Sequence, residues 1–198
     1  MASQTFIPLI VGGGIRTVDD IRGALKAGAD KVMINTAAIA RPEFINEAAD
    51  IFGSSTIVIA IEAIRHNGGY FCVTDNGREM TERQPVEWAQ EATHRGAGEV
   101  CITSVDHEGT GIGFDTQLTD AVWDAVRTPV IAHGGCGRPE HVKQVKTDVA
   151  LASILHYRTV REIEPVFVGS GNREFLKRRN DGFACVHDAT IAEVRACL

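Results

Sequence analysis

Short apolar runs alternate along this chain with longer segments in which apolar residues recur at helical spacing. An apolar run of four to eight residues bounded by turn signals is typical of a strand buried on both faces. Such runs occupy residues 8–11, 31–34, 56–61, 99–103, 129–132 and 149–152. The alternation therefore predicts six strand-then-helix units and an α/β fold with a parallel sheet.

Proline and capping signals indicate where the helices begin. Proline favours the first helical turn, and it stands at the expected starts of helices over residues 42–52 and 85–95. Another helix is expected over residues 115–126. In a capping box, a threonine and a side chain three residues later satisfy the first free N–H groups of a helix. The spacing occurs three times: Thr17 with Asp20, Thr81 with Gln84, and Thr190 with Glu193.

One segment departs from the alternating pattern. Residues 70–74 form a strand-like run, with His-Asn-Gly-Gly before it and Asp-Asn-Gly after it. Asn-Gly turns around such a run predict a small hairpin, inserted here over residues 66–80. The strand over residues 56–61 is expected to end before this hairpin, which would place Glu62 directly at the strand's end.

An internal repeat indicates the kind of sheet. Residues 8–14 align with residues 129–135, and the strand unit that follows each of them aligns as well. Two copies of a four-unit half would make a (β/α)₈ TIM barrel. The repeat places two further units before Met1, so we predict an incomplete barrel of about six units that lacks the first two. Residues 1–157 would form it, residues 158–187 an insertion or loop, and residues 188–198 its C-terminal helix.

Composition narrows the classes of partner and location. A net charge of −6 without a basic stripe argues against nucleic acid or an anionic membrane as the partner. The absence of a signal pattern and of a long apolar run predicts a cytoplasmic protein. Five cysteines without a Cys-x-x-Cys pair are typical of reduced thiols. His107 and His133 could meet at one site, but no histidine has a convincing metal spacing, and we predict neither metal nor cofactor.

Glycines and small polar residues follow the predicted strands, at the barrel end where active sites lie. Backbone N–H groups of such turns, with nearby hydroxyls and amides, bind phosphate without a large positive charge. The sequence predicts two groups of phosphate-binding residues. The first is Gly13 and Gly14 with Asn35 and Thr36, and the second is Gly109 with Gly134, Gly135 and Ser153. Each glycine cluster alone would also fit a tight turn, whereas two related clusters favour a ligand with two phosphates.

Two carboxylates are expected between these phosphate sites. Glu62 and Asp106 both follow predicted strands and could transfer protons if their surroundings adjust their pKa values. Glu108 is a third carboxylate nearby. The alternative for each carboxylate is a structural role, either capping the next helix or pairing with a base.

Several ordered motifs resemble those of one known family. They include Val-Gly-Gly-Gly-Ile at 11–15, Gly-Ala-Asp-Lys-Val-Met-Ile-Asn-Thr at 28–36, Thr-Ser-Val-Asp-His-Glu-Gly-Thr at 103–110 and Gly-Gly-Cys-Gly at 134–137. Over about residues 7–157 and the final helix, the chain resembles the cyclase subunit of imidazole glycerol phosphate synthase, from histidine biosynthesis. Members of this family are (β/α)₈ barrels with half-barrel symmetry, in agreement with the repeat.

The resemblance implies a reaction and a partner. A glutaminase subunit would supply ammonia, which attacks a bisphosphorylated ribulosyl-formimino-aminoimidazole carboxamide ribonucleotide. Cyclisation and cleavage would give imidazole glycerol phosphate and aminoimidazole carboxamide ribonucleotide. By position, Glu62 stands where the family has one catalytic Asp, and Lys31 and Glu99 match charged residues near the ammonia path, on the face where the glutaminase docks. The two phosphates would be bound by Gly14, Asn35 and Thr36, and by Gly109, Gly135, Ala152 and Ser153.

The chain also departs from the family pattern. The family's other catalytic Asp lies on the first strand and has no counterpart here, and Glu62 is one methylene longer than Asp. Ile64 replaces a lysine, Glu108 replaces an aspartate, and His133 replaces a small residue. Two other hypotheses therefore stay open: a phosphate-binding module without turnover, and a related phospho-sugar isomerase of the same pathway.

Overall fold

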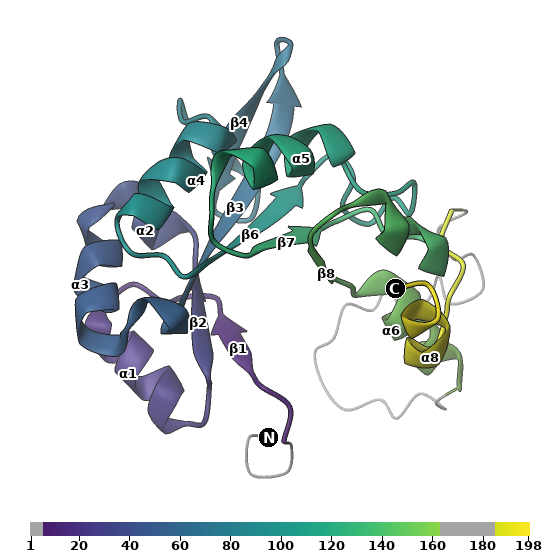
Figure 1. Ribbon diagram of the computed structural model, residues 1–198, viewed down its shortest axis with the longest axis horizontal. Helices are drawn as coiled ribbons and strands as arrows, with labels where there is room; N and C mark the ends of the chain where they lie inside the picture. The colour runs from purple at the N-terminus through teal and green to yellow at the C-terminus, as the bar shows by residue number, and fades with distance from the viewer. Residues whose placement is uncertain (1–5, 163–184) are drawn as a thin grey trace.

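A curled, mostly parallel sheet forms the centre of the molecule. The computed structural model describes residues 6–162 and 185–198. Six strands pair in parallel, each with the next, in the order β1 (Ile10–Gly12), β2 (Lys31–Ile34), β3 (Ile57–His66), β6 (Glu99–Ser104), β7 (Val130–His133) and β8 (Asp148–Ala150). Figure 1 shows the sheet curving from β1 round to β8. The predicted incomplete (β/α)₈ barrel is confirmed.

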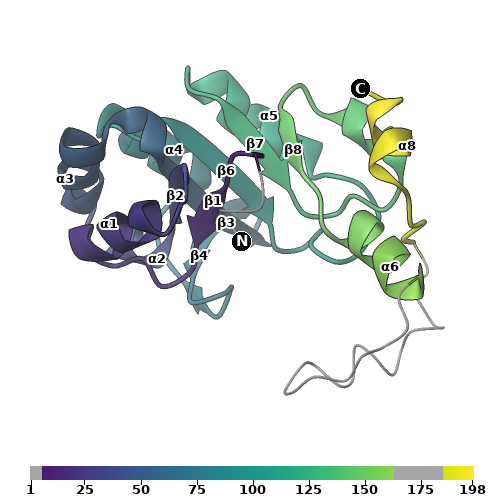
Figure 2. The ribbon, with the colours of Figure 1, turned by 90° about the horizontal axis from the view of Figure 1, so that it is seen from below.

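Helices cover the convex side of this sheet, as Figure 1 shows for α1, α3, α4 and α5. In Figure 2, α1 and α3 lie at the end of the sheet that carries β1 and β2, and α6 and α8 lie at the end that carries β8. The helical segments are α1 (Val18–Lys26), α2 (Thr36–Ala40), α3 (Glu43–Phe52), η2 (Ser54–Thr56), α4 (Pro85–His94), α5 (Thr116–Ala125), η3 (Pro139–Gln144), α6 (Ser153–Glu162) and α8 (Ile191–Arg195). Each parallel strand is thus followed by a helical segment, as the alternating pattern predicted.

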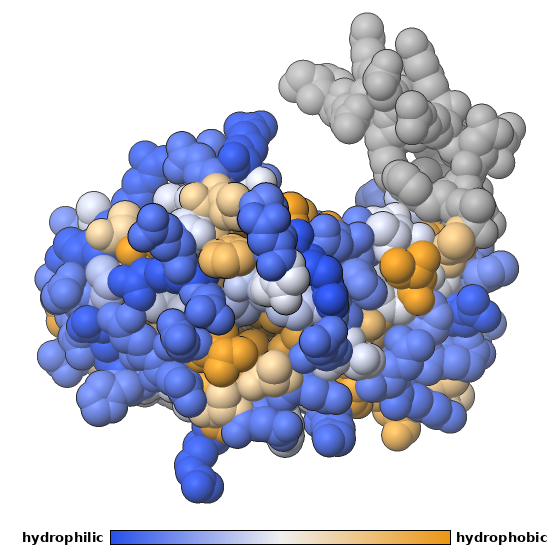
Figure 3. All heavy atoms as spheres, turned by 90° about the horizontal axis from the view of Figure 1, so that it is seen from above, coloured by the Kyte–Doolittle hydropathy of each residue, from blue (hydrophilic) through white to orange (hydrophobic). Residues whose placement is uncertain are grey.

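The main core lies between the sheet and these helices. Alternate strand residues point outward, so that Ile59 and Ile61 of β3 are fully buried against Phe44 of α3 and Trp88 of α4. The residues that alternate with them, Ala60 and Glu62, face the concave side and are only partly buried. Figure 3 shows mostly hydrophilic residues on one outer face, with hydrophobic ones gathered in its middle. On β3, the concave side therefore carries Glu62.

The predicted hairpin is present, but it changes the length of β3. Strand β3 pairs in parallel with β6 and continues to His66, because its second half also pairs antiparallel with β4 (Gly69–Thr74). Strand β4 in turn pairs with β5 (Glu79–Met80). The expectation that a strand ends before Glu62 is therefore wrong, since Glu62 lies within β3 and pairs with Val73 on one side and Thr103 on the other.

Two of the three predicted capping boxes are confirmed. Thr17 and Asp20 cap α1 reciprocally, and Thr190 and Glu193 cap α8 in the same way. The box at Thr81 is wrong, because α4 begins at Pro85 and the preceding Gln84 makes no side-chain capping bond. The Thr81 hydroxyl instead donates to the carbonyl of Cys72, 2.8 Å away, and so holds the hairpin.

Among the described residues, β1 and β8 pair on one side only, and Figure 1 shows an opening between them. The predicted boundary at residue 157 falls within α6, which continues to Glu162, and most of the predicted insertion over residues 158–187 lies outside the described residues. All five cysteines are free thiols. No helix in the described part of the chain is long and apolar enough to cross a membrane.

Candidate functional site

Strand register brings three polar side chains into one layer of the concave face. Glu62 of β3 pairs with Thr103 of β6, and Thr103 pairs with His133 of β7. Neighbouring strands lie about 4.8 Å apart, so the three side chains stand in a row at the carboxyl end of the sheet. The hydroxyl Oγ1 of Thr103 and Nδ1 of His133 are 3.1 Å apart, within hydrogen-bond distance. This row forms the centre of the candidate site.

Glu62 is half-buried and has neighbours of both charges. Burial raises the pKa of its carboxyl above the ordinary value, and the nearby Glu108 acts in the same direction. Hydrogen bonds from the Asn35 amide and the backbone N–H of Gly77 lower the pKa, as does the charge of His133. Burial is the largest of these effects, so the structure favours a carboxyl that holds its proton more readily than a free glutamate does.

The second predicted acid–base residue, Asp106, lies at the same end of the sheet in a different environment. Its Oδ2 accepts a hydrogen bond of 2.7 Å from the backbone N–H of Arg65, near the end of β3. The side chain is exposed and belongs to the loop after β6. Glu62 and Asp106 thus differ in burial, and the hydrogen bond fixes the loop that carries Asp106 against the extended β3.

The first predicted phosphate group lies at the ends of β1 and β2. Gly13 and Gly14 have φ angles of 92° and 76°, and a Cβ placed on either would meet no atom within 4 Å. Positive φ turns their amides out of the strand direction, and the open space leaves room for a ligand. Asn35 directly precedes α2, and its side-chain oxygen is buried without a hydrogen-bond partner. Thr36 accepts a hydrogen bond of 3.3 Å from the backbone N–H of Asp75 in the hairpin.

The second predicted phosphate group lies on the other side, at the ends of β6, β7 and β8. Gly109 has a φ of 74° and open space beside it, as Gly13 has. Gly135 differs, because a Cβ there would lie 2.0 Å from the carbonyl oxygen of Gly113. That glycine is required by close packing of two loops, and Gly134 is also close to backbone. Ala152 and Ser153 form the start of α6, where free N–H groups favour an anion.

A hydrogen-bond network fixes the loop after β6, and its members were not predicted from the sequence. Asp115 is 6% exposed, caps α5 through the N–H of Leu118, and accepts from the Tyr70 hydroxyl at 2.9 Å. Burial, aided by Asp115, raises the pKa of Tyr70. The hydroxyl of Ser104 also donates to Asp115, at 3.2 Å. The sequence offered one signal for Asp115, its position at the start of an expected helix. The contact between Asp115 and Tyr70 could not be predicted, because the two residues are 45 positions apart.

His107 and His133 do not share a partner. His107 donates from Nδ1 to the carbonyl of Gly113 at 2.8 Å, whereas His133 contacts Thr103. Within the part of the chain that the structure describes, no group of three or more His, Cys, Asp or Glu side chains could hold a metal ion. Each histidine therefore serves its own loop or strand.

Lys31 and Glu99 lie at the opposite end of the sheet. They are the first residues of β2 and β6, on either side of β3, and their side chains form an ion pair across that strand. Both are partly buried, with 29% and 18% of the side chain exposed. A pair at the amino ends of the strands lies at the opposite end of the sheet from Glu62, and its predicted place beside an ammonia path stays a prediction.

The fold and these residues define a protein of the (β/α)₈ barrel class whose polar groups gather at the carboxyl ends of the strands. A family model described as "Histidine biosynthesis protein" matches residues 1–161. Imidazole glycerol phosphate synthase subunit HisF of Natronomonas pharaonis is 50% identical over 176 residues, covering 79% of this chain and 65% of that protein. The same subunit of Pyrococcus furiosus is 47% identical over 178 residues, covering 86% and 70%. The chain belongs to the histidine biosynthesis protein family, and within it to the HisF proteins.

A third relative gives the same picture. HisF of Acidobacterium capsulatum is 50% identical over 161 residues, which cover 79% of this chain and 64% of that protein. The chain therefore spans about two thirds of the length of the curated relatives it matches.

Proposed function

We propose that the chain is an ammonia-dependent cyclase of L-histidine biosynthesis, a lyase. Its substrate would be a bisphosphorylated phosphoribulosyl-formimino-aminoimidazole carboxamide ribonucleotide. The products would be imidazole glycerol phosphate and aminoimidazole carboxamide ribonucleotide. The observation that carries the proposal is the half-buried Glu62, which stands between two open glycine turns, at Gly13 and Gly14 and at Gly109.

The proposed roles follow from this arrangement. One substrate phosphate binds at Gly13, Gly14, Asn35 and Thr36, and the unpaired buried oxygen of Asn35 accepts a hydrogen bond from a substrate hydroxyl. The other phosphate binds at Gly109, Gly134, Gly135, Ala152 and Ser153. Glu62 takes and returns a proton at the reacting nitrogen, a role that the burial raising its pKa favours. Asp106 is the second carboxylate in reach of the ligand.

A partner would supply the ammonia. The relatives are named subunits of imidazole glycerol phosphate synthase, and a glutaminase subunit is the partner that this name and chemistry favour. We propose a heterodimer in the cytoplasm, in which the glutaminase docks at the amino ends of the strands. There, the ion pair of Lys31 with Glu99 would stand at the mouth of the ammonia path.

The test is turnover of the bisphosphorylated substrate with ammonium salt. The chain is assayed alone, and again after mixing with a segment that contains the first two βα units of a HisF relative. Product formation in either assay, abolished by Glu62→Gln and retained by the surface control Glu87→Gln, would support the proposal. Substrate binding without turnover in both assays would instead indicate a phosphate-binding module. Turnover of the substrate of the related phospho-sugar isomerase, in place of the cyclase substrate, would indicate that the chain is the isomerase.

A further inference from the structure

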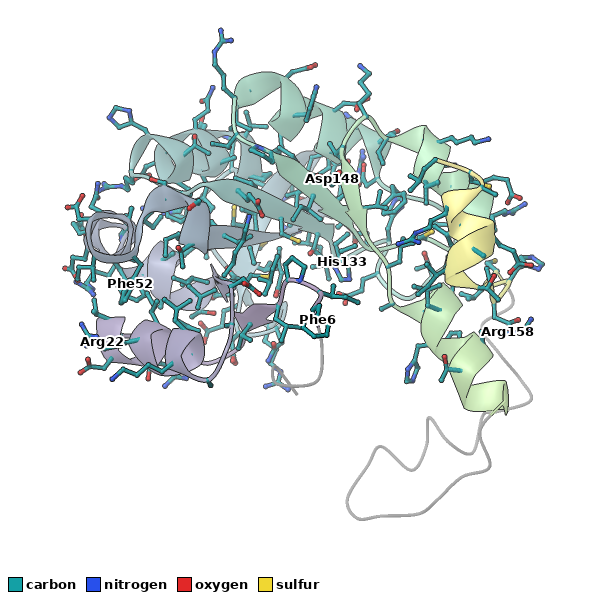
Figure 4. The ribbon with its side chains drawn as sticks, turned by 60° about the horizontal axis from the view of Figure 1, so that its bottom comes forward. Phe6, Arg22, Phe52, His133, Asp148 and Arg158 are labelled. Atoms are coloured by element: carbon teal, nitrogen blue, oxygen red, sulfur yellow. The ribbon has the colours of Figure 1, made fainter. Side chains whose placement is uncertain are left out.

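His133 has a position in the site that the proposed function does not yet use. It is the last residue of β7, in the same layer as Glu62 and Thr103. In Figure 4, His133 lies near the middle of the molecule, whereas Arg22 and Arg158 lie toward opposite ends. The imidazole is half-buried and has Thr103 as its neighbour on β6, itself 7% exposed. A histidine on the concave face thus points to the same space as Glu62.

Thr103 orients the imidazole. Its hydroxyl lies 3.1 Å from Nδ1 of His133, and the hydroxyl can either donate to that nitrogen or accept from it. Because Nδ1 is engaged in both protonation states, Nε2 is the nitrogen that gains or loses the proton. A hydroxyl partner of this kind holds the ring in place while its charge changes.

Two carboxylates lie near His133. Glu62 faces it from β3, and Glu108 approaches the same carboxylate from the loop after β6. On the other side, β8 pairs Ala150 with His133, which adds no charge. His107 is engaged by Gly113, and Asp106 is engaged by the backbone of Arg65. The charge of His133 acts on Glu62, so the two groups are close enough to interact.

We propose that His133 is the second proton-transfer group of this site, working with Glu62 across Thr103; the proposal rests on the cyclase function proposed above. Ammonia first condenses with the ketone of the ribulosyl chain, whose oxygen leaves as water. Ring closure then forms a bond between the ammonia-derived nitrogen and the formimino carbon, and cleavage breaks the bond from that carbon to the nitrogen of the departing ribonucleotide. Glu62 accepts the proton that the attacking nitrogen loses. His133 donates a proton from Nε2 to the departing nitrogen. Exchange with solvent then restores both groups, because Glu62 releases its proton to water and Nε2 of His133 takes one up.

The first experiment measures the pH dependence of turnover with ammonium salt. His133→Ser introduces a small side chain, and His133→Gln keeps a hydrogen bond without a titrating group. Both are expected to lower kcat by roughly 10²–10⁴-fold and to remove the alkaline limb of the pH profile, where Nε2 would lose its proton. His94→Ser, on the exposed end of α4, is the matched control and should match the unmodified chain. An unchanged rate and profile in His133→Ser would overturn the proposal.

The second experiment does not depend on turnover. The pKa of His133 is measured by NMR titration of the labelled imidazole, in the unmodified chain and in Glu62→Gln. Removing the carboxylate charge should lower the pKa of His133 and leave that of His94 unchanged; equal values for His133 would overturn the pairing. If neither the chain alone nor the chain with the added N-terminal segment shows turnover, the proposed function fails, and the titration still decides whether Glu62 and His133 interact through their charges.

Discussion

Glu62 shows how burial of a carboxyl group can lower stability. Its carboxyl is half-buried on the concave face, and burial opposes the charged form more than the Asn35 and Gly77 hydrogen bonds favour it. The folded state therefore binds a proton at Glu62 more tightly than the unfolded chain does. Such groups lower stability wherever they are forced to ionise, and they are common at functional sites.

We expect Glu62→Gln to raise the free energy of unfolding at neutral pH. The folded pKa is raised, so the wild-type chain loses stability as pH rises from the unfolded pKa through the folded pKa. The gain from Glu62→Gln should accordingly be small below that window and reach a plateau above it. Urea unfolding at several pH values measures it, with Glu87→Gln as the control for removing a surface carboxylate. A gain in the free energy of unfolding that is largest at acid pH would contradict the raised pKa of Glu62.

At the scale of elements, the turn between α4 and β6 packs directly on backbone. Gly98 lies in this turn, and its N–H donates to the carbonyl of Ile57 at 3.0 Å. A Cβ added to Gly98 would lie 2.2 Å from the carbonyl oxygen of Ser54, in η2. The contact joins two βα units, because η2 leads into β3 and Gly98 leads into β6. Only a residue without a side chain fits there.

Gly98→Ala should therefore destabilise the fold by about 1–3 kcal/mol, the usual cost of forcing extra volume into a packed site. Gly23 provides the opposite case, since it lies within α1 and has no atom within 4 Å of an added Cβ. Gly23→Ala should stabilise the fold by about 0.5–1 kcal/mol, because alanine loses less entropy in a helix. Urea midpoints of the two variants should move in opposite directions; a shift of the same sign in both would refute this packing argument.

Local signals in the sequence were sufficient to predict most strands and helices. They were insufficient where a residue bonds to a segment that is distant in sequence. The six parallel strands and two capping boxes were predicted correctly, because apolar runs and cap geometry depend on a few adjacent residues. Thr81 was misread as a cap, since its hydroxyl bonds Cys72 across the hairpin. Glu62 was placed at a strand end for the same reason: β4 extends β3 beyond it.

The site was predictable to a similar extent. Residues that follow strands in a parallel barrel must share one end, so the glycine turns, Glu62 and Asp106 could be brought together without coordinates. Two hydrogen-bond contacts around the site could not be predicted. Tyr70 of β4 reaches Asp115 at the start of α5, and Thr103 pairs with His133 of the neighbouring strand β7, so both contacts join segments that are remote in sequence.

For the molecule as a whole, the decisive feature is an open sheet. In the described residues, β1 pairs with β2 alone and β8 with β7 alone. Apolar side chains near β1 are exposed: Phe6 fully, Ile7 by 73% and Val11 by 40%. An edge strand with apolar neighbours is a template for pairing with another chain. We therefore expect the chain to self-associate through β1 in solution.

Val11→Lys should weaken this association by at least about tenfold, because strand pairing at β1 would bring the introduced positive charge into the apolar contact. Ile51→Lys is the matched control, since Ile51 is also exposed, by 53%, but lies on α3 away from both sheet edges. Sedimentation velocity over a range of concentrations measures the dissociation constant of each variant. Equal weakening by both substitutions would mean that general surface hydrophobicity drives association. Selective weakening by Val11→Lys would identify β1 as the strand through which the copies pair, and would predict that an added N-terminal segment competes for the same edge.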